Sequence, residues 1–231
     1  MAPLAGGAGD RPTGHSLITQ GSLQLQSDQL APTAPALGTG VQCFDVSAIE
    51  SVDVLDDSDN FQIDLHVGPG NTVTGIAWDV MISTIGASWL SEASIQISDT
   101  TGSADPNALV LAPGSGQDLP GMETFSSNGV VVLADNGAND IVVGNDGLLR
   151  LQFFESFDDV PDTTDAIWDN SATPVVCGGL FLQCTDQINC MWGVVDLEAP
   201  ALIPTLNPFG LVLLIAGLWL LALFRRQVLR Q

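Results

Sequence analysis

The densest group of chemically useful side chains in this sequence is a run of carboxylates between residues 155 and 169. Six acidic residues fall within these 15 positions, directly after an apolar stretch that is typical of a β-strand. Calcium in proteins binds about six to eight oxygen atoms, from carboxylates, main-chain carbonyls and water. We therefore predict a calcium site in this loop. Its candidate ligands are Glu155, Asp158, Asp159, Asp162 and Asp165.

A second acidic loop lies earlier in the chain and is a lesser candidate for the same cation. It holds Asp53, Asp56, Asp57 and Asp59, next to Asn60. The later loop does not follow the EF-hand pattern, because no glycine occupies the turn position and no glutamate ends the run. The alternative for both loops is plain solvation, since the whole chain is acidic.

Tryptophans are the second group with a possible binding role, because sugar rings stack on aromatic faces. Trp89 and Trp168 fall in predicted loops and are candidates for this stacking, whereas Trp78 is in phase with the apolar side of a strand and is expected in the core. Extracellular polysaccharide is therefore an alternative partner.

Catalysis is not expected from this sequence. Of the two histidines, His15 lies in an N-terminal leader and His66 on the outward side of a predicted strand. No Gly-x-Ser-x-Gly motif is present to place a nucleophilic serine. Carboxylate pairs with glycosidase chemistry occur by chance in so acidic a chain, so we predict that the protein is not an enzyme.

The charge of the chain limits its partners. The sequence holds 27 Asp and Glu against five Arg and no Lys, for a net charge of −22. Phosphate recognition needs Lys and Arg, so nucleic acid is excluded as a partner. Hydrophobic residues make up 45% of the chain, which is enough to predict a packed core in place of disorder.

The candidate side chains are predicted to lie on and between β-strands, because apolar and polar residues alternate with a period of two in the region 41–198. Residues 61–67 alternate apolar and polar, and residues 72–83 form a long strand. Shorter apolar segments follow, each bounded by Gly, Pro, Asn or Asp. We therefore predict a mainly β fold: an antiparallel, jelly-roll-like β-sandwich. The further strands expected are 93–98, 109–111, 130–133, 141–143, 148–154, 175–182 and 191–195.

Residues 1–40 are predicted to be a flexible leader, because they are rich in Gly, Ala, Pro, Ser and Gln. They lack the basic region and the apolar region of a signal peptide. An exported protein needs such a peptide, so we expect the true translation start to lie upstream; the alternative is that the C-terminal tail alone directs insertion.

Four cysteines favour two disulfides in an exported domain. We expect one bond within the C-terminal cluster, either Cys184–Cys190 or Cys177–Cys184. The other bond then ties Cys43 to the remaining cysteine. A zinc site is the rival, but the spacings are too wide for a zinc knuckle.

The end of the sequence predicts a membrane anchor. Residues 209–224 are uncharged and apolar, and as a helix they span about 24 Å, close to a hydrocarbon core of about 30 Å. Arg225 and Arg226 follow as a membrane stop. Basic flanks remain cytoplasmic, so we predict one C-terminal transmembrane helix, a cytoplasmic tail over 225–231 and an outward-facing domain before them.

A short motif precedes this helix within a proline-containing linker, residues 199–208. The motif is Ile203, Pro204, Thr205 and Leu206. Together with the apolar helix and the Arg pair, it resembles the IPTL-CTERM sorting signal. That signal is a relative of the PEP-CTERM signals handled by exosortase-type membrane proteases in Gram-negative bacteria. The resemblance implies an exosortase-like sorting protease and a lipid bilayer as partners.

The middle of the chain also resembles an uncharacterised extracellular domain that often precedes such tails, over residues 75–80, 88–93 and 149–159. We therefore expect a bacterial inner-membrane protein with its domain in the periplasm, sorted to the cell surface or beyond. The expected role is a structural or surface one in the cell envelope or extracellular matrix. The alternative is a calcium-dependent carbohydrate-binding module.

Overall fold

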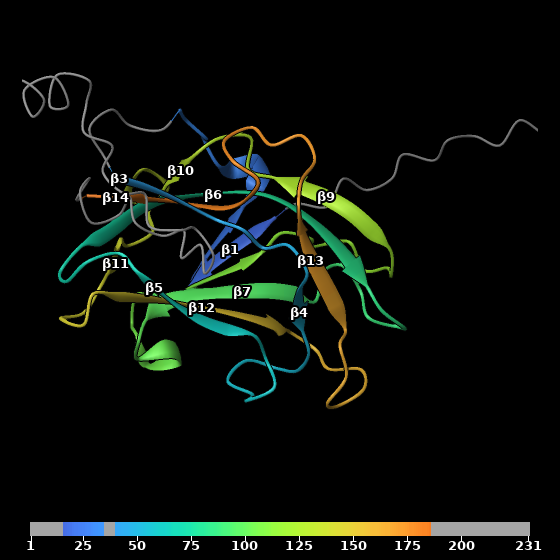
Figure 1. The fold of residues 1–231 in the computed structure, drawn as a ribbon. Coiled ribbons are helices and arrows are strands. Elements are labelled where there is room, and N and C mark those ends of the chain that lie inside the picture. Colours follow the sequence, from blue (N-terminus) through green and yellow to red (C-terminus); the bar gives the residue numbers. More distant parts are fainter. Residues whose placement is uncertain (1–15, 35–39, 186–231) are drawn as a thin grey trace, which may run out of the picture. The chain divides into compact units, whose positions relative to one another are not determined.

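The computed structural model describes residues 16–34 and 40–185. Contacts divide the chain into residues 1–194 and 195–231, and every described residue belongs to the first unit. This unit is mainly β: two antiparallel sheets form a sandwich, and the described helices are three short 3-10 turns (Figure 1). The turns are η1 (Ser27–Gln29), η2 (Gly102–Ala104) and η3 (Ala134–Asn136).

The first sheet has six antiparallel strands. Its centre is the pairing of two long apolar strands, in which Leu151 lies opposite Ile97 and both side chains are fully buried. In sheet order the strands are β2 (Leu23–Gln26), β1 (Leu17–Gln20), β8 (Leu109–Ala112), β7 (Ala93–Asp99), β12 (Leu148–Glu155) and β5 (Gln62–His66).

The second sheet has eight strands built around the 13-residue strand β6 (Thr72–Thr84). β14 and β13 pair along one edge of β6, and β11, β10 and β9 pair in turn along the other edge. β3 and β4 complete the sheet on the outer sides of β14 and β13. The remaining strands are β3 (Gly40–Phe44), β4 (Ile49–Ser51), β9 (Met122–Ser126), β10 (Val131–Val132), β11 (Ile141–Val142), β13 (Ala166–Asn170) and β14 (Gly179–Cys184).

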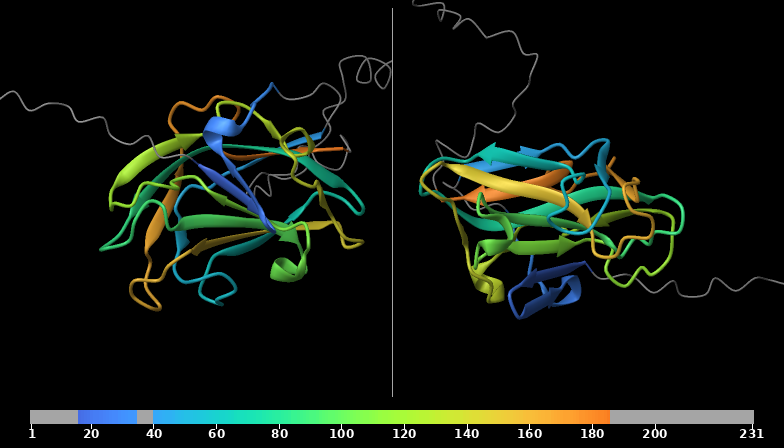
Figure 2. Two further views of the ribbon diagram at one scale, coloured as in Figure 1. Left: turned by 180° about the vertical axis from the view of Figure 1, so that it is seen from behind. Right: turned by 90° about the horizontal axis from the view of Figure 1, so that it is seen from below.

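The core lies between the two sheets, which Figure 2 shows as stacked layers. Phe153 of the first sheet packs edge-on against Trp168 of the second, with ring centroids 5.3 Å apart and planes at 80°. Trp78 is fully buried, as predicted, and its indole nitrogen donates a hydrogen bond to Ser16 Oγ at 3.2 Å. Aromatic pairs of this geometry add about 1 kcal/mol to the burial of their area.

The prediction of a flexible leader over residues 1–40 is wrong for its second half. β1 and β2 form a hairpin that extends the first sheet, with β1 paired to β8. Ile18 is fully buried in the core, and Gln20 binds the main chain of Asn107 and Asn139. The period-two pattern Leu-Gln-Leu-Gln over residues 23–26 was a strand signal within a sequence whose composition suggested a linker.

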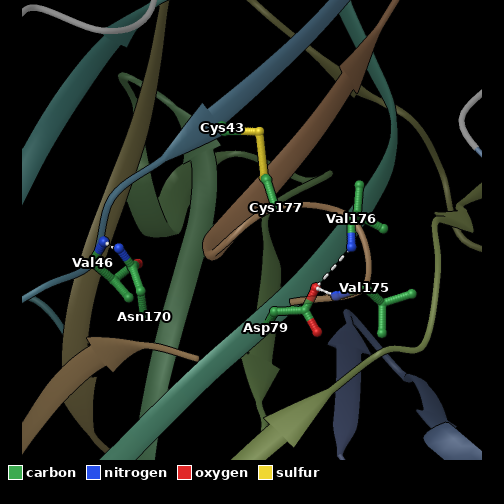
Figure 3. Close-up of a disulfide and its surroundings, with 7 residues drawn as sticks. All are labelled: Cys43, Val46, Asp79, Asn170, Val175, Val176 and Cys177. Carbon is green, nitrogen blue, oxygen red and sulfur yellow. Dashed lines mark hydrogen bonds between the residues drawn. A yellow bond between two sulfur atoms is a disulfide. The ribbon is translucent and has the colours of Figure 1, made fainter. Parts of the chain in front are cut away.

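One predicted long-range disulfide is present and joins Cys43 of β3 to Cys177, 134 residues later (Figure 3). It lies on the outer face of the second sheet, since Cys43 is exposed and Cys177 half-buried. The alternative Cys177–Cys184 pairing is therefore excluded. Cys184 is also disulfide-bonded, and Cys190 lies outside the described residues.

The tail predictions fall on residues that the structure does not describe. The sorting motif, the helix over 209–224 and the Arg pair all belong to the range 186–231. Within the described ranges, no helix has the length and apolar character needed to cross a bilayer.

Candidate metal centre

Four loops that cross from one sheet to the other meet at one end of the sandwich. We call this region the acidic end. Figure 1 shows two of its loops, β4–β5 and β12–β13, leaving the sandwich on the same side. The four loops are residues 52–61 (β4–β5), 85–92 (β6–β7), 113–121 (β8–β9) and 156–165 (β12–β13).

Main-chain hydrogen bonds hold these loops to one another. The β6–β7 loop binds the β8–β9 loop through Leu90 N to Leu119 O at 3.1 Å. The β12–β13 loop binds the β6–β7 loop through Ser156 N to Glu92 O at 2.8 Å. At the edge of the β4–β5 loop, Glu155 N donates to Asp53 O at 2.9 Å. The carboxylates are therefore carried by an interlocked set of loops.

The charge of this end is negative throughout. With Glu155 included, the four loops hold eleven acidic residues and no basic one. Across residues 16–34 and 40–185, Arg150 is the sole lysine or arginine, and its guanidinium is paired with Asp64 on β5 at 2.7 Å. No described protein cation is left to neutralise the acidic end.

Asp53 is the central residue of the site, because it is a buried carboxylate with an unused oxygen. Its side chain is only 4% exposed. Oδ1 accepts a long hydrogen bond from Asp162 N at 3.3 Å, whereas Oδ2 is buried without any hydrogen-bond donor. Asn60 fixes the loop around it: Asn60 Oδ1 accepts from Asp53 N at 3.0 Å, and Nδ2 donates to Val54 O at 2.7 Å.

Two exposed carboxylates lie against Asp53. One oxygen each from Asp53, Asp57 and Asp59 falls within 4.8 Å of the others. Oxygens bound to one calcium ion at about 2.3–2.6 Å lie no more than about 5 Å apart, so this spacing fits a shared cation. Asp57 also accepts a hydrogen bond from Asp59 N at 3.0 Å, which sets the turn between them.

Other carboxylate oxygens at the acidic end are, like Asp53 Oδ2, buried without a hydrogen-bond donor. Glu155 is fully buried and Asp165 is 3% exposed, yet each has one oxygen without a donor. Burial of an ion without a partner costs several kcal/mol, so such groups call for a cation or a proton. The carboxylate oxygens in this state are Asp53 Oδ2, Glu155 Oε2, Asp158 Oδ1, Asp159 Oδ2 and Asp165 Oδ2.

Three of these carboxyl groups, Glu155, Asp158 and Asp165, have raised pKa values. Burial raises the pKa of Glu155 to about 8, against the opposing effect of the hydrogen bond from Ser51 and with further help from the charge of Asp165. Burial also raises the pKa of Asp165 and of Asp158, and the negative charge of Asp53 adds to the shift at Asp158. A bound cation would lower the pKa of the carboxyl groups around it, because it favours their charged form.

The structure separates the predicted ligands into two groups. Glu155, Asp158, Asp159 and Asp165 lie at the acidic end with buried oxygens, but none of them belongs to the set of described carboxylates close enough to share an ion. The side chain of Asp162 is exposed, and its main-chain N–H donates to Asp53. The earlier loop, a lesser candidate by sequence, supplies the closest set of carboxylates. Asp56 is not in that set: it accepts a hydrogen bond from Ser103 at 2.5 Å.

The prediction that Trp168 stacks on sugars is wrong, because Trp168 lies in β13 with no exposed surface. Its indole nitrogen donates to Ser51 Oγ at 3.2 Å, and Ser51 in turn donates to Glu155. Trp89 does lie in a loop, with 43% of its surface exposed. It lines a pocket of about 570 Å³ at the acidic end, beside Glu92, Asp159 and the exposed ring of Phe157.

Comparison with known proteins adds no identification: no family model, no curated protein and no solved structure matches this chain. The fold and the site therefore define only a class: an acidic antiparallel β-sandwich with a candidate centre for a cation that prefers oxygen ligands.

Proposed function

We propose that this chain is an exported bacterial surface protein whose β-sandwich binds calcium at the acidic end. Two observations carry the calcium assignment: Asp53 is buried with its Oδ2 lacking a donor, and one of its oxygens lies close to one oxygen each of Asp57 and Asp59. The role is structural: a cation there holds the β4–β5 loop, which runs from one sheet to the other and is bonded to the β12–β13 loop through Asp162 N. We also propose that the sandwich is of the jelly-roll type, as the sequence predicts.

Calcium suits the donor set better than other divalent ions. The available ligands are carboxylate and carbonyl oxygens, which excludes soft metals that select thiolates. Magnesium prefers a small octahedral shell that keeps several waters, whereas calcium accepts many protein oxygens in irregular geometry. Loops between strands, held by main-chain bonds, supply such irregular geometry.

The exported location is supported by the sequence and is compatible with the disulfides. The tetrapeptide Ile203 to Leu206, the apolar run over 209–224 and the Arg pair have the layout of a sorting signal. Disulfides persist in oxidising compartments, and the Cys43–Cys177 bond is at the surface of the sandwich. Extracellular calcium is also abundant enough to fill sites with dissociation constants of about 10⁻⁴–10⁻³ M.

The calcium site is tested by titrating the full-length chain, in mild detergent and after treatment with a chelator. We expect a binding signal by calorimetry and a rise in the melting temperature of roughly 5–10 °C at about 100-fold excess over the dissociation constant. Asp53→Asn, and separately the exposed pair Asp57→Asn with Asp59→Asn, should remove most of that rise. The control is Asp135→Asn, on the exposed turn η3, which should respond to calcium as the native chain does.

Asp53→Asn carries its own check on folding. In chelator, this variant should melt at or above the temperature of the native chain, because it removes an uncompensated buried charge. The calcium assignment fails if calcium gives the native chain neither heat nor stabilisation. It also fails if the three carboxamide substitutions leave the calcium effect intact.

The sorting signal is tested by the mass of the mature protein recovered from cells. We expect a cut near Pro204 and loss of residues 209–231. Replacing the motif Ile203 to Leu206 by alanines should leave the full tail in place, with the chain retained in the inner membrane. Equal processing of both forms would contradict the sorting role and leave a plain tail anchor.

A further inference from the structure

The pocket beside Trp89 has a composition that the calcium site does not explain. Its aromatic walls are the indole of Trp89, 43% exposed, and the ring of Phe157, 60% exposed. Two large exposed aromatic side chains lining one pocket are uncommon on a monomer and mark a binding surface. At about 570 Å³, the pocket falls within the size range of small-molecule sites.

The rest of the pocket wall is acidic. Glu92, Asp118 and Asp159 line it, with no basic residue among its lining residues. Burial raises the pKa of Glu92, and the negative charges of Asp159, Asp165 and Asp118 raise it further. The charges of Asp118 and Asp159 are therefore felt at Glu92, and a positive group placed in the pocket is attracted to all three carboxylates.

Trp89 is held in position by this acidic wall. Its main-chain N–H donates to Glu92 Oε2 at 2.7 Å, and Glu92 N donates back to Trp89 O at 3.1 Å. The main chain of Ser156, beside Phe157, binds Glu92 O at 2.8 Å. The main-chain segments that carry the aromatic and acidic side chains are thus bonded to one another before any ligand arrives, which lowers the entropic cost of binding.

We propose that this pocket binds a protonated amino sugar of an extracellular polysaccharide, through its ammonium group and the face of its ring. An ammonium group near the indole face and three carboxylates gains both cation–π and charge–charge attraction. Ser91 and Ser156 add hydrogen-bonding groups for sugar hydroxyls. The uronic acids of other polymers carry the same sign of charge as the pocket and are repelled.

This inference goes beyond the calcium-binding role and does not require it. Asp159 is the one residue shared by the pocket and the group of buried carboxylates without donors. Measuring sugar binding both with calcium and with chelator separates the two assignments. Sugar binding that survives in chelator supports the pocket whatever the outcome of the calcium titration.

The test uses the full-length chain in mild detergent and a matched pair of oligosaccharides. One is a β-1,4-linked glucosamine tetramer at about pH 6, where primary amines carry their proton. The other is the N-acetylated tetramer, with the same ring and linkage but no charge. We expect the glucosamine tetramer to bind at least tenfold more tightly by calorimetry. A lysine oligomer should bind more weakly than the glucosamine tetramer.

Variants assign the binding to this pocket. Trp89→Ala and Glu92→Gln should each weaken the glucosamine tetramer about tenfold; the glutamine keeps an oxygen that accepts from Trp89 N. The controls are Val142→Ala and Asp135→Asn, exposed residues in other elements, which should change nothing.

Three outcomes overturn the inference. They are equal affinity for the acetylated tetramer, equal affinity for the lysine oligomer, and unchanged affinity in both pocket variants when thermal melting shows that these are folded.

Discussion

At the scale of single residues, two buried aspartates differ in whether both carboxylate oxygens accept hydrogen bonds. Asp79 is 1% exposed, and both oxygens are used: Oδ1 accepts from Ser126 at 2.5 Å, and Oδ2 accepts from Val175 N and Val176 N (Figure 3). Asp53 is 4% exposed and leaves one oxygen without a donor. Burial alone does not identify a ligand site, whereas a buried acceptor without a donor calls for an ion, a water or a proton to explain it.

Glu155 predicts how the stability of the calcium-free protein depends on pH. Its pKa is about 8 in the folded chain and near 4.5 in the unfolded one. Between these values the folded state holds a proton that the unfolded state has lost. The free energy of unfolding therefore falls as pH rises from about 4.5 to about 8, by roughly 3–5 kcal/mol from this residue. Urea unfolding in chelator at several pH values measures this slope.

Glu155→Gln should flatten the slope, because glutamine still accepts the hydrogen bond from Ser51 and cannot ionise. Glu123→Gln, on strand β9, should keep the native slope. A native chain whose stability rises with pH through this window would show that Glu155 is ionised in the folded state.

The sequence identified the carboxylates of both acidic loops but ranked the loops in the wrong order. Glu155, Asp158, Asp159 and Asp165 were predictable because they follow one strand within a few residues. The central position of Asp53 depends on a contact with Asp162, 109 residues away, which no local pattern encodes. Trp168 was misplaced for a related reason: the strand β13 is short and its neighbours are acidic, so it resembled the loop before it.

At the scale of secondary-structure elements, β14 depends on a glycine that tolerates no side chain. Gly179 has a φ of 88°, and a Cβ there would overlap the carbonyl oxygen of Phe44 and lie 2.6 Å from Asn170 Oδ1. Gly21, in the β1–β2 turn, also has a positive φ of 56°, but no atom lies within 4 Å of its Cβ position. A side chain at Gly21 would therefore meet backbone strain alone, whereas one at Gly179 would meet both backbone strain and steric overlap.

Gly179→Ala should destabilise the protein by more than about 3 kcal/mol, because the pairing of β14 with β3 must shift to admit the methyl group. Gly21→Ala should cost only about 1 kcal/mol, the strain of the left-handed region. Chemical denaturation of both variants measures the difference. Similar losses for the two would show that the surroundings of Gly179 relax easily.

Strands with clear alternation were predictable, and those that depend on partners were not. β5, β6, β7 and β12 lie within a residue or two of their predicted bounds, because each carries a long apolar pattern. β9 (Met122–Ser126) and β4 (Ile49–Ser51) were not predicted, since they are short and partly exposed and gain their order from pairing with β6 and β13. Tertiary pairing outweighs local propensity at such positions.

At the scale of the whole molecule, the Cys43–Cys177 bond closes a loop that contains most of the sandwich. Its sequence separation of 134 residues predicts a contribution of about 5 kcal/mol to stability in the chain-entropy description. Cys43→Ala with Cys177→Ala should lower the free energy of unfolding by about that amount in urea. A loss below about 1 kcal/mol would show that the unfolded chain is already compact without the bond.

The sequence and the structure cover different parts of the whole molecule. The antiparallel sandwich follows from short apolar segments and turn residues, and the described residues confirm it. The order of strands around β6 was not predictable, because it depends on pairings such as β6 with β9 and β14 that join distant segments. The tail over 199–231 stays a prediction from sequence.

The Cys43–Cys177 bond also sets how the domain transmits mechanical load. β14 begins two residues after Cys177, and the bond joins the segment before it to β3, the third strand of the described sandwich. Tension applied along the chain from either side passes through two sulfur atoms and bypasses the 134-residue span between them. At about 3.4 Å per residue, roughly 450 Å of chain cannot be drawn out while the bond is intact. Under tension the span between the two cysteines therefore keeps its length, whereas the β1–β2 hairpin lies before Cys43 and is not protected by the bond.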